Sequence, residues 1–263
     1  MEKWRIIISS CLFFSVLLVQ AQEKKMVNGR IGFEFGISGV FGRSVTPDRI
    51  RANRSMYEYD DFSCGLPGPN QDAEILYGGV KYEYPLWGNR LGLSAGLRFS
   101  KISSELSPDW SYSHFLWLFR QEGQNTDYLT IRDITQENYY LGVPIELRYF
   151  FPRRRDSFFK QYVKLGVAVN YRLSTENSIT FYDNAMTQYA DAVGKQIEKP
   201  ASFNAYIYPA YGFRLGKMKD FQFNLEFQFP GFLAGKKAHP FIRQEFGVGM
   251  QMSVQMPLSK IIK

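Results

Sequence analysis

Apolar and polar residues alternate at every second position in several segments of this chain. Between Phe221 and Phe229 every odd position is Phe or Leu, and every even position is Gln, Asn or Glu. From Leu91 to Ser100 apolar residues likewise alternate with Gly, Ser and Arg. A period of two places successive side chains on opposite faces of a β-strand. These segments are therefore predicted to be strands with one apolar and one polar face.

The same alternation recurs in eight segments of similar length. Each has about the length, on the order of 9–11 residues, that a tilted strand needs to cross the hydrocarbon layer of a membrane. Repeated segments of this kind are the sequence signature of a transmembrane β-barrel. The eight segments are Ile31–Phe41, Leu76–Leu86, Leu91–Ile102, Tyr139–Phe151, Val163–Leu173, Phe203–Leu215, Phe221–Phe229 and Phe246–Met256.

The composition agrees with strands rather than helices as the membrane-crossing elements. Aromatic residues make up 17% of the chain, yet its mean hydropathy is −0.27. Apart from the N-terminal segment, no apolar run is long enough for a spanning helix, so a helical membrane protein is excluded. Because alternating strands are half polar, a barrel can be rich in Phe and Tyr and still hydrophilic on average.

The connections between the eight segments alternate in length. Short connections carry Gly, Asn, Pro or Asp, which are typical turn residues. Outer-membrane barrels have short periplasmic turns and long extracellular loops. We therefore predict an all-β, antiparallel up-and-down transmembrane β-barrel in the outer membrane, with eight strands and both termini in the periplasm. The short connections are 87–90, 152–160 and 217–220, and the mostly long ones are 42–75, 103–138, 174–202 and 231–242.

Two of the long loops carry patterns of their own. His114–Gln121 and Tyr128–Ile134 flank a Glu-Gly-Gln-Asn turn and indicate a hairpin. This hairpin either extends the neighbouring strands above the membrane or adds two strands to give a ten-stranded barrel. Asn184–Val193 is compatible with a short helix.

The first residues have the layout of a secretory signal peptide. Lys3 and Arg5 precede an apolar run, and small residues stand before a cleavage site at Gln22. The expected organisation is a signal peptide over residues 1–21 and an outer-membrane β-barrel domain over residues 22–263. Cys11 follows a weak lipoprotein-like box, but most of the apolar run lies after it, so it is interpreted as part of the signal. Cys64 is then the only cysteine left, and no intramolecular disulfide can form.

The polar faces of the strands carry acids and bases in nearly equal number. An eight-stranded barrel has an interior just wide enough to be filled by side chains. Charges buried there must pair, because a lone buried charge costs several kcal/mol. We interpret them as a structural ion-pair network; a ligand site or a narrow polar pore is the alternative. The predicted lumen residues are Glu34, Lys81, Glu83, Arg98, Glu146, Arg148, Lys164, Arg172, Arg214, Glu226 and Glu245.

Aromatic residues gather next to the predicted periplasmic turns, as in the girdles at membrane interfaces. A soluble hydrophobic core is the other interpretation of these residues, and it fits the outward Phe face of Phe221–Phe229 poorly. Two prolines, Pro144 and Pro209, lie inside predicted strands, where a closed barrel has no free edge, so bulges or strand ends are expected there. The girdle candidates are Tyr84, Trp87, Tyr149, Phe150, Phe151, Phe158 and Phe159.

The sequence contains few candidate catalytic residues. Its only histidines, His114 and His239, fall in predicted extracellular loops, and Ser113 next to His114 projects to the opposite side in a strand. No metal-spaced His/Cys set, phosphate-binding loop or dinucleotide motif is present. We therefore predict no catalytic residue, no metal and no cofactor. The net charge of +7 is spread along the chain, so it indicates solvated loops and contact with anionic lipid rather than nucleic acid.

The segment Tyr139–Tyr149, Tyr-Tyr-Leu-Gly-Val-Pro-Ile-Glu-Leu-Arg-Tyr, resembles a strand of the PorT-like outer-membrane β-barrel family. In that family a Tyr-Leu-x-Ile/Val-Pro stretch leads to a basic residue and Tyr or Phe, and Pro144 is a tolerated feature. The resemblance implies an integral outer-membrane barrel, and some members assist protein secretion. The chain departs from many such barrels at its end, Met256–Lys263, where the usual terminal aromatic residue is missing.

Three hypotheses for function follow. The first is a non-enzymatic barrel with a structural or interaction role, which contacts a secretion-system or surface protein through its long loops or its turns. The second is a narrow pore or a lipid-handling barrel, including a lipid-A-modifying enzyme. The third is a soluble, lipocalin-like periplasmic barrel. The first predicts contact with outer-membrane lipid and lipopolysaccharide, and with the barrel-assembly machinery during biogenesis.

Overall fold

The protein is described by a computed structural model that covers residues 29–45, 50–52, 70–87, 90–107, 116–119, 128–151, 157–217, 219–235 and 240–260. The predicted signal peptide, Cys11, Cys64, His114 and His239 lie outside these residues. None of the described helices is long and apolar enough to cross a membrane.

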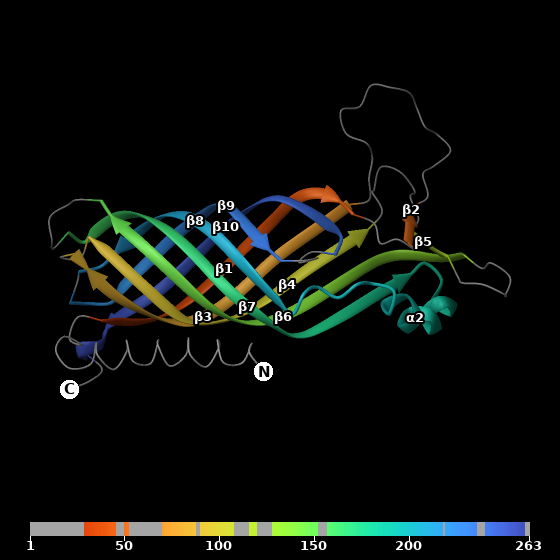
Figure 1. Cartoon of the computed structure of the whole chain (residues 1–263), viewed down its shortest axis with the longest axis horizontal. Coiled ribbons are helices and arrows are strands. Elements are labelled where there is room, and N and C mark those ends of the chain that lie inside the picture. The colour runs from red at the N-terminus through yellow and green to blue at the C-terminus, as the bar shows by residue number, and fades with distance from the viewer. Residues whose placement is uncertain are drawn as a thin grey trace, which may run out of the picture.

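Eight antiparallel strands close into a barrel (Figure 1). Each strand pairs with its sequence neighbours in the wall, and the ring is closed by the pairing of the first and last strands. This confirms the prediction of an eight-stranded up-and-down barrel. The wall consists of β1 (Arg30–Ser44), β3 (Asn70–Leu86), β4 (Leu91–Ser107), β6 (Tyr128–Phe150), β7 (Phe159–Phe181), β8 (Phe203–Leu215), β9 (Gln222–Ala234) and β10 (Ile242–Pro257).

One end of the barrel, here called the turn end, holds the three short connections. Gly216 begins the β8–β9 turn with a φ of 116°, a conformation that residues with a Cβ rarely adopt. A Cβ there would also lie 2.3 Å from the carbonyl oxygen of Phe221. The first and last wall strands also meet at this end, where Arg30 pairs with Pro257. A short 3₁₀ helix, η4 (Leu258–Lys260), follows β10.

The two prolines inside strands behave differently. Next to Pro209 the register between β8 and β9 shifts between Ile207 and Ala210, so the predicted irregularity is present there. Pro144 sits within β6 with no register shift on either side, so the expected bulge or strand end is wrong at this position. Its ladder with β7 is continuous, and only the pairing with β4 is interrupted, opposite Gly96. Because proline lacks an N–H, a local gap on one side is sufficient to accommodate it.

The outer surface of the barrel is a continuous apolar belt. On β7 the outward residues are apolar from Val163 to Leu173, and exposed polar residues follow from Ser174 onward. Ten steps of about 3.3 Å at a tilt of about 40° give a belt about 25 Å tall, the height of the apolar band of transmembrane barrels. Exposed apolar side chains on every wall strand make up this belt, among them Phe33, Val80, Leu97, Val143, Val169, Ile207, Phe227 and Val254.

At the turn end, aromatic side chains border the belt. Trp87, Tyr149 and Phe158 are exposed on the outside, as expected for a girdle. Phe150 is an exception: its side chain is buried inside the barrel, with its ring centroid 5.1 Å from that of Tyr162. The prediction that Phe150 faces lipid is wrong because adjacent residues of a strand point to opposite faces.

At the opposite end, the loop end, the sheet continues beyond the belt as a structure we call the platform. β6 and β7 are each 23 residues long and remain paired as far as Ile131 and Phe181. β5 (Leu116–Phe119) forms the predicted hairpin with β6, and β2 (Ile50–Ala52) pairs with β5. Both short strands stand outside the closed wall, so the hairpin does not enlarge the barrel to ten strands.

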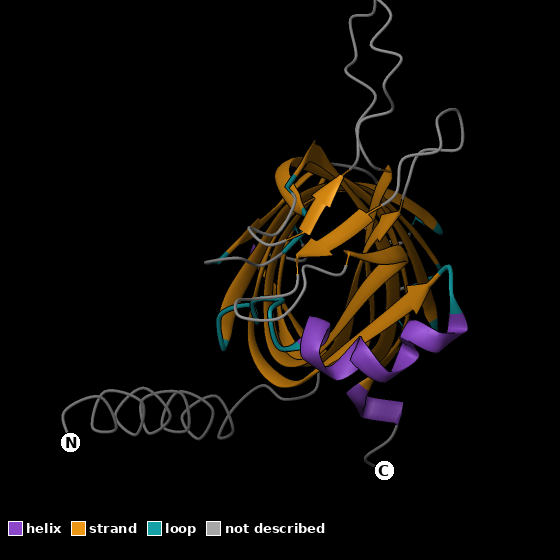
Figure 2. Cartoon of the chain, turned by 90° about the vertical axis from the view of Figure 1, so that its right-hand side faces the viewer, coloured by secondary structure: helices purple, strands orange, loops and turns teal. Residues whose placement is uncertain are grey.

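The platform also contains the predicted helix. It is formed by η3 (Asn184–Tyr189) and α2 (Ala190–Gly194) (Figures 1 and 2). Buried apolar residues of the helix, of the strand extensions and of the β9–β10 loop share one hydrophobic cluster. It consists of Leu106, Leu129, Ile131, Ile134, Phe181, Val193, Ile197 and Phe241.

The belt can be tested by comparing one substitution at two heights of β7. Val169→Arg places a charge near the middle of the belt, and we expect it to lower the free energy of unfolding by about 2–4 kcal/mol. The matched substitution Ser178→Arg lies on the platform, where water solvates the guanidinium, and should change it little. Denaturant unfolding of the protein inserted in lipid vesicles measures both. Equal effects at the two positions would contradict the assignment of the belt.

Candidate functional site: the charged interior of the barrel

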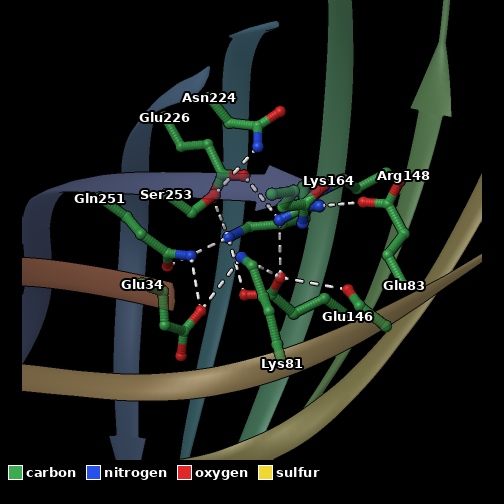
Figure 3. A network of polar contacts seen from close by, with 12 residues as sticks. Glu34, Lys81, Glu83, Glu146, Arg148, Lys164, Asn224, Glu226, Gln251 and Ser253 are labelled. Atoms are coloured by element: carbon green, nitrogen blue, oxygen red, sulfur yellow. Dashed lines mark hydrogen bonds and ion pairs between the residues drawn. The ribbon is translucent and has the colours of Figure 1, made fainter. Parts of the chain in front are cut away.

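The interior brings together nine of the eleven predicted lumen residues, drawn from seven wall strands, and Figure 3 labels seven of them. Their side chains point toward one another and are 5% exposed or less. These nine are Glu34, Lys81, Glu83, Arg98, Glu146, Arg148, Lys164, Arg214 and Glu226. Arg30, which the charge pattern alone did not single out, is buried with them.

The centre of this network is organised around Glu146. Its carboxylate accepts from Lys164 at 2.9 Å and lies 3.2 Å from the ammonium group of Lys81. Arg98 approaches it at 3.4 Å and donates to Glu34 at 2.7 Å. Lys81 also bridges Glu34, at 3.1 Å. Each of these charges therefore has at least two partners of opposite sign.

Glu226 completes this central layer from the other side of the barrel. It forms an ion pair with Lys164 and accepts from Arg148 at 2.9 Å. The hydroxyl of Tyr162 also donates to it, at 2.6 Å. The central layer thus contains three carboxylates, Glu34, Glu146 and Glu226, and three cations, Lys81, Arg98 and Lys164.

A second layer lies nearer the turn end, around the carboxylate of Glu83. Arg214 donates to its two oxygens at 2.8 and 2.6 Å, in a bidentate pair. Arg30 donates to it at 3.2 Å, and Arg148 also pairs with it. Arg148 connects the two layers because its other terminal nitrogen reaches Glu146 and Glu226.

Neutral side chains complete the network. Tyr208 donates to Glu146 at 2.8 Å, and Gln251 donates to Glu34 at 2.9 Å. The guanidinium of Arg98 lies 4.1 Å from the ring centroid of Tyr77, a cation–π distance. These neutral residues cannot be identified from the pattern of charges alone. Their position in the strand is a usable signal. Tyr77 stands an even number of positions from Lys81 on the same strand, so both side chains point to the same face.

Two predicted lumen residues do not belong to the network. Glu245 is exposed because the register between β1 and β10 shifts between Phe41 and Gly42, which leaves an extra residue at this point of β10. The prediction for Glu245 is therefore wrong. Arg172 is half-buried at the loop end, where it donates to the carbonyl oxygen of Pro200. With Arg30 added, the network holds six cations and four carboxylates, a less even balance than predicted.

Toward the loop end apolar residues join neutral polar ones in the interior. Along β4 the inward residues after Arg98 are Ser100, Ile102, Ser104 and Leu106, and Ile102 and Leu106 belong to two separate hydrophobic clusters. The lower cluster shares Tyr77 and Tyr208 with the network and extends from it toward the loop end. The upper cluster is the platform core. Between the charged interior and the loop end lie two apolar clusters, interspersed with buried neutral polar side chains such as Ser104 and Asn138. The lower cluster comprises Val40, Ala73, Ile75, Tyr77, Ile102, Tyr140, Ala168, Tyr206, Tyr208 and Ile242.

The charges of the described interior are paired with opposite charges. Among its buried residues there is no His or Cys, and the hydroxyl of Ser94 donates to the carboxylate of Glu146 at 3.3 Å. Among the described residues no group of three His, Cys, Asp or Glu side chains could hold a metal ion. His114 and His239 lie outside the described residues.

No known family model matches the chain, and no curated protein matches it. Among solved structures it is similar to the outer membrane protein OprG from Pseudomonas aeruginosa, with a TM-score of 0.36, 13% identity and coverage of 87% of this chain and 92% of that one. It is also similar to LpxR from Salmonella typhimurium, with a TM-score of 0.25, 8% identity and coverage of 86% and 99%.

The class of the protein follows from its own geometry. A closed antiparallel wall, an apolar belt about 25 Å tall with aromatic residues at its border and a polar interior together define a transmembrane β-barrel of the outer-membrane type.

Removing one charge from the turn-side layer should show how strongly the network holds the fold. Glu83→Gln leaves three buried guanidinium groups around a neutral amide, and we expect it to lower the free energy of unfolding by about 3–5 kcal/mol. Glu137→Gln is the matched control, because Glu137 forms a partly exposed ion pair with Lys101 at 2.6 Å. Glu137→Gln should lower the free energy of unfolding by about 1 kcal/mol or less. Urea titration of vesicle-inserted protein followed by tryptophan fluorescence measures both, and similar losses would contradict the role of Glu83.

Proposed function

We propose that the protein is a sealed integral outer-membrane barrel that holds the platform at the cell surface, where the platform contacts a partner protein. In this proposal the turn end and both termini face the periplasm. The chain is exported by its signal peptide, inserted by the barrel-assembly machinery, and surrounded by phospholipid and lipopolysaccharide. The proposed role is structural and interactive rather than catalytic.

The observation that carries the proposal is the filled interior. A pore needs a continuous water-filled path, whereas here the fully buried ion pairs are followed by two apolar clusters. An interior of this kind stabilises the wall and does not conduct. This disfavours the narrow-pore alternative.

The platform supports the interaction half of the proposal. Strands that only need to cross the membrane would end at the top of the belt, yet β6 and β7 continue beyond it. The extension has its own buried core and is covered by η3 and α2. An ordered surface is a better binding site than a loose loop because less conformational entropy is lost on binding. A secretion-associated partner, as the PorT-like resemblance implies, is the form of this interaction to test first.

Conductance measurements test the seal. We expect the purified protein in planar lipid bilayers to give no stable unitary steps, because the interior offers ions no path. An open porin inserted under the same conditions is the positive control. Reproducible steps of one size from the native protein would contradict the proposal in favour of the pore.

Site-directed labelling tests the orientation and the platform. In a Cys64→Ser background, Lys195→Cys at the end of α2 should react with a membrane-impermeant maleimide on intact cells. Lys219→Cys in the β8–β9 turn should react only after the outer membrane is opened. Both lysines are exposed, so accessibility within the fold does not distinguish them. A photo-crosslinker attached at position 195, but not at 219, should trap the surface partner. Reversed labelling would contradict the orientation.

A further inference from the structure

The two layers of the interior differ in net charge. In the central layer three carboxylates face three cations. In the turn-side layer Glu83 is the one carboxylate, and it is shared by Arg30, Arg148 and Arg214. The two excess positive charges of the network therefore lie in the turn-side layer. Buried charge that is not balanced is unfavourable by several kcal/mol, so this layer favours a further negative charge.

A small pocket opens beside this layer at the turn end. Charged and polar side chains of five strands line it together with three apolar residues, and there is room for about one water molecule or small ion. Three of its side chains are cationic and one is anionic. The lining residues are Arg30, Glu83, Pro85, Leu91, Phe150, Lys160, Arg214 and Gln222.

Three hydrogen-bonding groups in or beside the pocket have no partner within the protein. Arg30 is 4% exposed, and its Nε atom donates to no partner. Gln222 is 1% exposed; its amide nitrogen donates to the carbonyl oxygen of Lys217, whereas its Oε1 atom has no partner. Gln255, which pairs with Gln222 across the β9–β10 ladder, has an unpartnered amide nitrogen. Buried polar atoms without partners are rare and indicate a bound water or ion. Of these three, the two N–H donors can contact an anion, whereas the Oε1 of Gln222 can only accept, for example from a water molecule.

We propose that this pocket binds a small monovalent inorganic anion of the size of chloride. The anion accepts from the Nε of Arg30 and lies in the positive potential of Arg30, Arg214 and Lys160. It offsets part of the excess charge that Glu83 alone leaves around it. A water molecule can satisfy the same hydrogen bonds, but it does not reduce the charge.

The site is reached from the turn end only. The central ion layer and the two apolar clusters lie between the pocket and the loop end. In the proposed orientation the anion exchanges with the periplasm and not with the outside of the cell. The anion site does not depend on the proposed interaction role, because its residues belong to the barrel interior and not to the platform.

Bromide is a suitable probe because it replaces chloride and is visible by anomalous diffraction. Crystals of the full mature chain in detergent, grown or soaked in sodium bromide, should show one anomalous peak in the pocket, next to Arg30. Arg30→Gln should abolish the peak. Arg132→Gln is the matched control, since it removes an exposed guanidinium on the platform and should leave the peak unchanged.

A second variant separates an anion site from a purely structural cluster. Gln222→Glu is nearly isosteric and supplies a covalent negative charge to the pocket. We expect it to abolish the bromide peak and to raise the midpoint of thermal unfolding in chloride-free buffer. For the native protein, replacing gluconate by chloride at constant ionic strength should raise the midpoint, and in Gln222→Glu this dependence should be lost.

The outcomes decide the proposal. A bromide peak that Arg30→Gln and Gln222→Glu remove, together with the chloride dependence, supports it. A native pocket with no anomalous peak, filled by water only, overturns it. Gln222→Glu that unfolds at a lower midpoint and keeps the chloride dependence of the native protein also overturns it.

Discussion

The structure depends on one constraint: inside a hydrocarbon layer every backbone N–H and C=O must find its partner within the protein. For strands, this requires a sheet without edges, and the pairing of β1 with β10 provides the closure. Closure in turn creates an interior that eight strands leave only wide enough for side chains. The irregularities stay local for the same reason. At Pro144 one pairing is interrupted, while the ladder with β7 continues.

The closed interior explains why the charges form a network rather than separate pairs. Glu34, Glu146 and Glu226 approach the axis from three different strands, and each is contacted by cations from others. Such a network ties strands that are far apart around the wall to one register, because a shift by one residue would turn each charge toward lipid. We regard this fixing of the register as its main contribution to the fold. The turn-side layer is the exception, since its excess positive charge favours binding of an anion from outside the chain.

The lower and upper clusters lie between the charged interior near the turn end and the platform at the loop end. At the turn end a small pocket lined by Arg30 and Gln222 opens beside the buried polar interior. At the loop end the upper cluster, which includes Phe181 and Phe241, joins the platform to the barrel top. A platform with its own buried core above a barrel filled by side chains is consistent with the proposed interaction role. The barrel then acts as an anchor, and specificity belongs to the surface above the membrane.

The sequence by itself determined the wall: its alternation gave eight strands, the outward face of each, and nine of the interior charges, because parity along a strand is a local property. The alternation along one strand cannot predict bulges or contacts between strands, and only the tertiary structure decided these. A bulge in β10 turned Glu245 outward, and strand pairing set which carboxylate each of Arg98, Arg148 and Arg214 contacts. The platform core and the uneven charge of the two layers likewise arise from residues distant in sequence. Their positions follow from how the sheet closes, and that closure is a property of the whole chain.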